Sequence, residues 1–122
     1  MIGLDTNVLL AWILAGHSRP LPPAAAYRLS VVVLAELVWV LTRRLKHTRS
    51  SACGVLAELL EAADLVIDRR EAVTQALIDY RKGPADFADY FIAFDNEDAG
   101  CRTTLTLDKD AGRHPAFTLL RY

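Results

Sequence analysis

The sequence predicts an α/β fold: a single domain over residues 1–122, with a parallel β-sheet of about five strands and helices on both faces. Two observations lead to this prediction. Short apolar runs alternate with longer stretches of helical periodicity, which is the pattern of parallel strands joined by right-handed helical crossovers. In addition, 122 residues with 52% hydrophobic content are enough for one core, because a chain of this size buries roughly two thirds of its unfolded surface.

The expected strands are short apolar runs that end at polar or turn-forming residues. In chain order they are Met1–Leu4, Ala25–Leu29, Leu65–Ile67, Thr103–Leu107 and Phe117–Leu120. The second is the weakest, since it opens with two alanines. It follows a stretch from His17 to Pro23 whose three prolines predict a loop.

The expected helices carry apolar residues at spacings of three and four. They are a first helix that ends near Ala15, then Val31–Lys46, a third from Ser50 or Ser51 to Ala63, Glu71–Arg81, Asp86–Asp98 and a short turn over Lys109–Arg113. The second begins with three valines, which favour a strand, but helical spacing follows them. Its expected apolar face consists of Leu34, Leu37, Val38, Leu41 and Leu45.

Polar residues and breakers mark the ends of these helices. We expect Thr6 or Asn7 to cap the first helix and Ser30 to cap the second, because their side chains accept hydrogen bonds from the free N–H groups of a first turn. The Gly83-Pro84 pair ends the fourth helix.

The net charge is −1, so the whole chain exerts no general attraction on nucleic acid. A nucleic acid would have to be bound by metal ions or by a local basic patch. One such patch follows the second helix: Arg43, Arg44, Lys46, His47 and Arg49. Two explanations of the patch stay open, namely a solvated helix end, where cations favour the dipole, and contact with phosphates.

No apolar run approaches the ~18 residues that span a bilayer, and the N-terminal segment lacks the basic start and the cleavage site of a signal peptide. We therefore expect a cytoplasmic protein without a membrane segment. Cys53 and Cys101 are then expected to be reduced thiols, since a disulfide requires an oxidising compartment. The histidines His17, His47 and His114 are scattered, and none is expected to bind a ligand.

Acidic residues recur where predicted strands end and helices begin. Asp5 follows the first strand, Asp108 follows a late strand, and Glu36 lies early in the second helix. Asp86 and Asp89, three residues apart on one helical face, open the helix before the late strand. Because a doubly wound sheet places its site outside the carboxyl ends of the strands, we expect these acids to meet.

Clustered carboxylates repel one another and stay ionised together only when cations are present. Ligation by oxygen alone suits Mg²⁺ or Mn²⁺ better than zinc. Such ions position a water molecule and neutralise charge on a phosphoryl group, so hydrolysis of phosphodiesters is the expected chemistry.

Each acid also has a purely structural explanation. Asp5 could cap the first helix, and Glu36 could be an ordinary surface residue. Asp86 and Asp89 could be first-turn acids that favour the helix dipole, and Asp108 could be a turn residue. The prediction of a site therefore depends on their joint positions.

Four short motifs span nearly the whole chain in order. They are IGLDTNVLL (2–10), the segment from Ser30 to Ala35-Glu36-Leu37, ADFADYFIA (85–93) and LTLDKDA (105–111). In this order they resemble PIN domains and, more narrowly, VapC-type toxin ribonucleases of bacterial toxin–antitoxin pairs. The resemblance implies a PIN-like fold and endonucleolytic cleavage of RNA that depends on Mg²⁺ or Mn²⁺.

The resemblance also implies roles for individual residues. The four catalytic acids would be Asp5, Glu36, Asp89 and Asp108. Among them, Asp5, Asp89 and Asp108 would be the metal ligands, with Glu36 near the ion or its waters. Asp89 is chosen over Asp86 because it directly precedes the Tyr-Phe-Ile-Ala segment where the family places its third acid. Supporting residues would be Thr6, Asp86 and Thr106.

The implied partners are an RNA substrate, a small cognate antitoxin whose segment occupies the acidic cleft, and a second copy of the chain. The first candidates for holding the RNA backbone are Arg43, Arg44, Lys46 and Arg49. Three aromatic residues are candidates either for exposed anchors at partner surfaces or for the core: Trp12, Tyr27 and Trp39.

Three alternatives remain. A phosphatase with Asp5 as its nucleophile would normally carry a second Asp two residues on, where this chain has Asn7. A receiver-type phospho-acceptor domain would have paired acids at its first strand, and the pair is missing although Lys109 could match its late lysine. The third is a catalytically silent PIN-like RNA- or protein-binding module, which the presence of all four acids disfavours.

Overall fold

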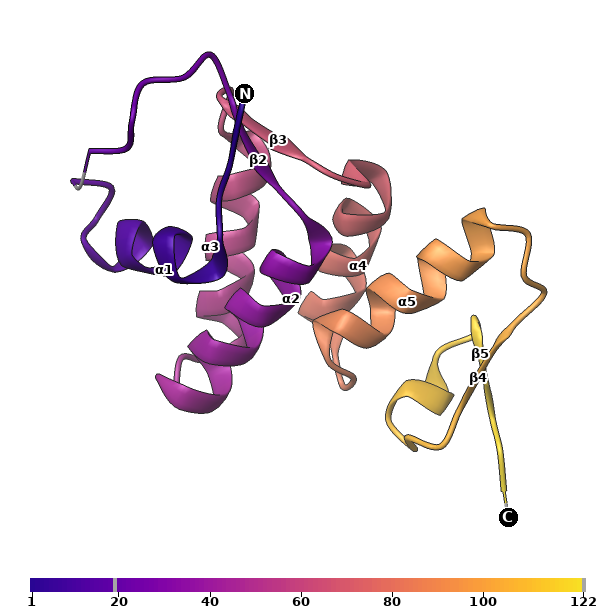
Figure 1. Ribbon diagram of the computed structural model, residues 1–122. Helices are drawn as coiled ribbons and strands as arrows, with labels where there is room; N and C mark the ends of the chain where they lie inside the picture. Colours follow the sequence, from indigo (N-terminus) through magenta and orange to yellow (C-terminus); the bar gives the residue numbers. More distant parts are fainter. Residues whose placement is uncertain (19, 122) are drawn as a thin grey trace. The chain divides into compact units, whose positions relative to one another are not determined.

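The computed structural model describes residues 1–18 and 20–121 (Figure 1). The chain divides into two compact units, Met1–Arg69 and Arg70–Tyr122, and we describe each by itself.

The first unit contains a parallel three-stranded sheet in the order β1-β2-β3. Its elements are β1 (Ile2–Gly3), α1 (Thr6–Leu14), β2 (Tyr27–Leu29), α2 (Val31–Trp39), the π-helical turn η1 (Val40–Arg44), α3 (Arg49–Glu61) and β3 (Leu65–Ile67). Ile2 pairs with Tyr27 and Tyr27 pairs with Leu65. Helices connect the strands, as parallel pairing requires.

The core of this unit follows the predicted periodicities, with one exception. On β2, Tyr27 and Leu29 are buried and Arg28 between them is exposed. On the helix formed by α2 and η1, four of the five predicted apolar residues are buried: Leu34, Leu37, Val38 and Leu41. The prediction that Leu45 joins this face is wrong, because the helix widens into a π turn and ends at Leu45, whose side chain is 43% exposed.

The predicted cap of the first helix is also wrong. Asp5, with extended backbone angles, is the N-cap of α1, and its Oδ1 atom accepts a hydrogen bond from Thr6 N over 2.7 Å. Thr6 is already helical and buried, so neither Thr6 nor Asn7 can cap. Ser30 caps α2 as predicted, by accepting a hydrogen bond from Val33 N.

The third helix begins earlier than predicted, at Arg49. Thr48 is its N-cap, and the Thr48 hydroxyl accepts a hydrogen bond from Ser51 N over 3.0 Å. On this helix Leu56 and Leu59 are buried, while Val55 and Leu60 are half-buried.

The second unit pairs two helices with a two-stranded parallel sheet. Its elements are α4 (Arg70–Lys82), α5 (Phe87–Asp98), β4 (Thr104–Thr106), the 3₁₀ turn η2 (Ala111–Arg113) and β5 (Phe117–Leu119). The helices α4 and α5 lie side by side (Figure 1). Their interface includes an edge-to-face contact of Tyr80 with Phe87, whose ring centroids are 6.1 Å apart.

His114 holds the C-terminal segment of this unit against α4. Its Nε2 atom lies 2.6 Å from Oδ2 of Asp79, and its Nδ1 atom accepts a hydrogen bond from Ala116 N over 3.1 Å. The rings of Tyr90 and Phe94 contact the imidazole edge to face. Since both ring nitrogens have partners, His114 has a structural role here.

The α/β class and the parallel pairing of all five strands are confirmed. The strands form one sheet of three and one of two, each within its unit. A single five-stranded sheet with helices on both faces stays a prediction. Among the helices of the described residues, none is long and apolar enough to cross a membrane. Cys53 is buried and Cys101 is exposed, and neither forms a disulfide.

Candidate active site

Asp5 follows the end of β1, and one residue, Leu4, lies between it and the strand. Its side chain is exposed, and the cap of α1 uses only Oδ1. Within the described part of the chain, Oδ2 makes no hydrogen bond. The capping role and a ligand role are therefore compatible, because one carboxylate oxygen serves each.

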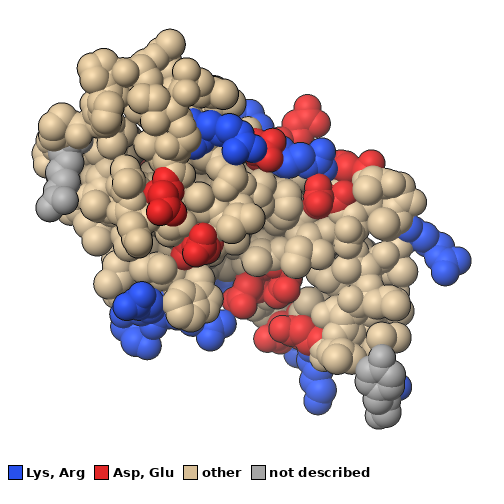
Figure 2. Space-filling view, viewed as in Figure 1, with Lys and Arg blue, Asp and Glu red and all other residues tan. Residues whose placement is uncertain are grey.

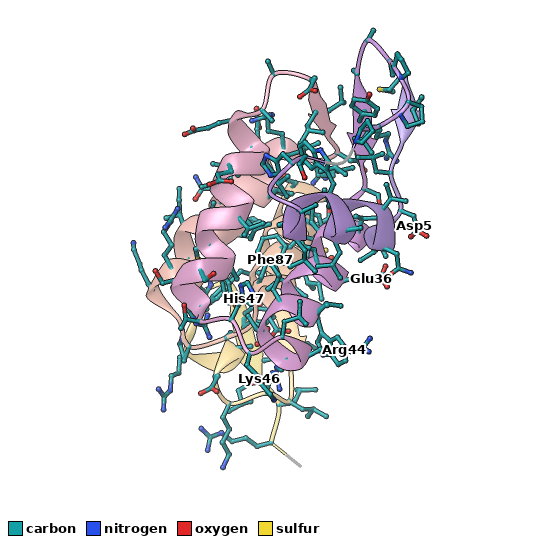
Figure 3. All side chains as sticks on the ribbon, turned by 90° about the vertical axis from the view of Figure 1, so that its left-hand side faces the viewer. Asp5, Glu36, Arg44, Lys46, His47 and Phe87 are labelled. Carbon is teal, nitrogen blue, oxygen red and sulfur yellow. The ribbon has the colours of Figure 1, made fainter. Side chains whose placement is uncertain are left out.

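Thr6 connects Asp5 to the second predicted acid of this unit. It is the one buried polar side chain among the described residues, at 6% exposure. Its hydroxyl donates a hydrogen bond to Oε1 of Glu36 on α2 over 3.0 Å, while its backbone N–H donates to Asp5. Figure 3 shows the carboxylates of Asp5 and Glu36 on the same side of this unit. The packing of α1 on α2 thus brings together two acids from distant parts of the sequence.

The second unit carries the other predicted acids. Asp86 is the N-cap residue of α5, and Asp89 lies in its first turn. Asp108 follows β4, and its Oδ1 atom accepts hydrogen bonds from the N–H groups of Asp110 and Ala111. The N–H of Asp108 in turn donates to the hydroxyl of Thr106 over 3.0 Å. Asp108 therefore organises the turn into η2, as the structural explanation of this residue expects.

The surroundings of Asp89 disfavour its charged form. Burial raises the pKa of Asp89 above its usual value, and the negative charges of Asp86 and Asp108 raise it further. A hydrogen bond with the backbone of Asp86 partly offsets these effects. The native state of this unit thus favours a proton, or another cation, at Asp89.

The two units each present carboxylates without completing a metal centre. Over residues 1–18 and 20–121, no group of three or more His, Cys, Asp or Glu side chains is placed so that it could hold a metal ion. The donor chemistry nevertheless fits Mg²⁺ or Mn²⁺, because the predicted ligands are all carboxylates and Asp5 and Asp108 are exposed.

The basic patch lies at the end of the α2–η1 helix and at the start of α3. Arg43, Arg44 and Lys46 are exposed, and Arg49 is half-buried. Figure 2 shows Lys and Arg side chains gathered over this helix end. In Figure 3, Arg44 lies on the same side of the unit as Asp5 and Glu36. Both the helix-end and the phosphate-contact explanations remain open.

The three aromatic candidates for partner surfaces differ in their exposure to solvent. Tyr27 is buried, and its hydroxyl donates to the carbonyl of Pro22 over 2.6 Å. Trp12 is half-buried and stacks on His17. Trp39 alone of the three is largely exposed, at 55%. The sequence signal for its position was its spacing of three residues from Glu36, which placed both on one helical face.

A cavity of about 630 Å³ in the second unit is lined by Arg70, Glu71, Phe94 and Glu97, among others. None of the predicted site residues lines it.

No model of a known protein family, no curated protein and no solved structure matches this chain.

Proposed function

We propose that this chain is an endoribonuclease that depends on Mg²⁺ or Mn²⁺ and hydrolyses RNA phosphodiester bonds. The observation that supports this proposal most is the arrangement around Thr6, whose N–H and hydroxyl hold Asp5 and Glu36 on either side of one buried residue. This hydrogen bond fixes the carboxylate of Glu36 beside Asp5, as supporting residues do at metal sites. A second reason to expect a cation is the raised pKa of Asp89, which is caused first by burial and then by the nearby charges of Asp86 and Asp108.

In this proposal Asp5, Asp89 and Asp108 would hold the cation. The bound cation would lower the pKa of a water molecule and neutralise the charge that develops on the phosphate. Glu36 would orient the attacking water through Oε2, because Oε1 is occupied by Thr6. The supporting residues would be Thr6, Asp86 and Thr106.

The RNA backbone would be held by the basic patch, through exposed Arg43, Arg44 and Lys46 and half-buried Arg49. By its resemblance to VapC-type toxins, the chain would act as the toxin of a toxin–antitoxin pair. A cognate antitoxin would then inhibit it, and a second copy of the chain would form a homodimer with it.

The experiment is cleavage of total RNA by the purified chain, with mapping of the new ends. Cleavage should require Mg²⁺ or Mn²⁺, stop in EDTA and return when the metal is added in excess. Asp5→Asn and Asp89→Asn should each abolish cleavage with an unchanged circular dichroism spectrum. Cleavage that persists in EDTA would contradict the metal mechanism. RNA that is bound but never cut would instead support the catalytically silent binding module.

A further inference from the structure

One face of the α2–η1 helix carries an exposed indole beside the candidate active site. The helix is continuous from Val31 to Arg44. Val32, Glu36 and Trp39, at positions i, i+4 and i+7, lie on one face and are exposed. Trp39 is thus one turn from Glu36, with more than half of its surface open to solvent.

The π-helical turn brings an arginine into line with these residues. The N–H of Leu45 donates to the carbonyl of Val40 over 3.0 Å, the i→i+5 pattern of a π-helix. A π turn uses more residues than an α turn, so Arg44 falls on the line where position 43 of a regular α-helix would lie. Figure 3 agrees, since Glu36 and Arg44 project to the same side. Carboxylate, indole and guanidinium therefore follow one another along a single face.

The charge pattern selects the kind of partner that this face would bind. Between Glu36 and Glu58 the sequence contains no acidic residue, while it contains Arg43, Arg44, Lys46 and Arg49. A large exposed aromatic ring with several cations beyond it is the combination that binds single-stranded nucleic acid, through stacking of bases and neutralisation of phosphates.

We propose that Trp39 is a stacking platform for an unpaired RNA base next to the scissile phosphate, an inference that rests on the proposed nuclease function. The substrate is then single-stranded RNA or the loop of a folded RNA. In a duplex, both faces of a base are covered by its neighbours, so the indole has no free face to stack on. Arg44 and Lys46 would contact the phosphates that follow this base.

The test measures binding separately from cleavage. The Asp5→Asn protein is used in EDTA, and a further Trp12→Phe substitution leaves Trp39 as the one tryptophan. Adding a uridine-rich single-stranded oligonucleotide should quench the fluorescence of Trp39, whereas a blunt RNA duplex of the same length should not. In the same Asp5→Asn background, we expect Trp39→Ala to lower the affinity for a dye-labelled single strand by about fivefold or more, as measured by fluorescence anisotropy. Trp39→Phe, which keeps a ring, should stay within about threefold, and Val32→Ala on the same face is the matched control.

Unchanged affinity of Trp39→Ala for the single strand, or equal quenching by the duplex, would overturn the inference. So would a Trp39→Ala protein that binds RNA normally but no longer self-associates in sedimentation velocity, since the face would then contact a second copy. Cleavage by the wild type with normal binding by Trp39→Ala would remove this inference and leave the nuclease. Quenching and weakened binding in a chain that never cuts RNA would keep the stacking site and remove the nuclease.

Discussion

The hydroxyl of Thr6 donates a hydrogen bond to Oε1 of Glu36 over 3.0 Å, across thirty positions of sequence. The donor is buried and the acceptor lies on an exposed side chain. Because the backbone N–H of the same threonine also binds Asp5, one residue fixes the relative position of two candidate catalytic acids.

Replacing Thr6 should separate its support of the site from its contribution to folding. Thr6→Val keeps the shape of the side chain and removes the hydroxyl, so Glu36 loses its partner. We expect about 1 kcal/mol lower stability in urea unfolding and about tenfold to a hundredfold slower RNA cleavage. Thr6→Ser keeps the hydroxyl and should restore most of the rate. Wild-type cleavage by Thr6→Val would show that Glu36 needs no positioning.

Asp5 combines a capping role with the proposed ligand role, and two substitutions distinguish them. Asn caps a helix as well as Asp does but lacks the charge, so Asp5→Asn should keep the stability and abolish cleavage. Asp5→Ala should abolish cleavage and also lose about 1 kcal/mol in urea unfolding.

Thr48→Ala is the control for this pair, because it removes the cap of α3 without touching a predicted acid. It should lower the stability by a similar amount, about 1 kcal/mol, and leave the cleavage rate unchanged. An active Asp5→Asn protein would mean that Asp5 is a cap alone.

The raised pKa of Asp89 predicts a specific pH dependence of stability in EDTA. Below its ordinary pKa of 3.8, Asp89 is protonated in both the folded and the unfolded state. Between 3.8 and the raised native pKa, the unfolded chain ionises first, so this group lowers the free energy of unfolding as pH rises. Asp89→Asn should therefore gain stability relative to wild type between pH 3 and pH 7. Urea unfolding across this pH range measures the gain in the free energy of unfolding of Asp89→Asn over the wild type. A gain that stays constant or falls as pH rises would contradict the prediction.

Magnesium should test whether Asp5 and Asp89 both contribute to ion binding. A ligand that binds only the folded state stabilises it in proportion to the logarithm of its concentration. Millimolar Mg²⁺ should raise the melting temperature of the wild type above its value in EDTA. Asp5→Asn and Asp89→Asn should each abolish this increment, and the double variant should show no further loss. Partial losses that add in the double variant would indicate two separate sites.

Local signals predicted much of the secondary structure. The strand Leu65–Ile67 has the predicted bounds, and Ser30 caps α2 as predicted. The errors lie at helix ends, where neighbouring polar residues compete for one role. Asp5 caps the first helix in place of Thr6 or Asn7, and the third helix begins at Arg49, one or two residues before the predicted start.

The sequence by itself determined the order of strands and helices, since apolar periodicity and capping residues act over only a few positions. It also determined which acids lie at strand ends and helix starts. Only the tertiary structure decided that Thr6 bonds Glu36, that Leu45 leaves the core and that burial raises the pKa of Asp89. Each of these depends on how far a helix continues or on residues distant in sequence, and hydrogen bonds, burial and charge act through space rather than along the chain.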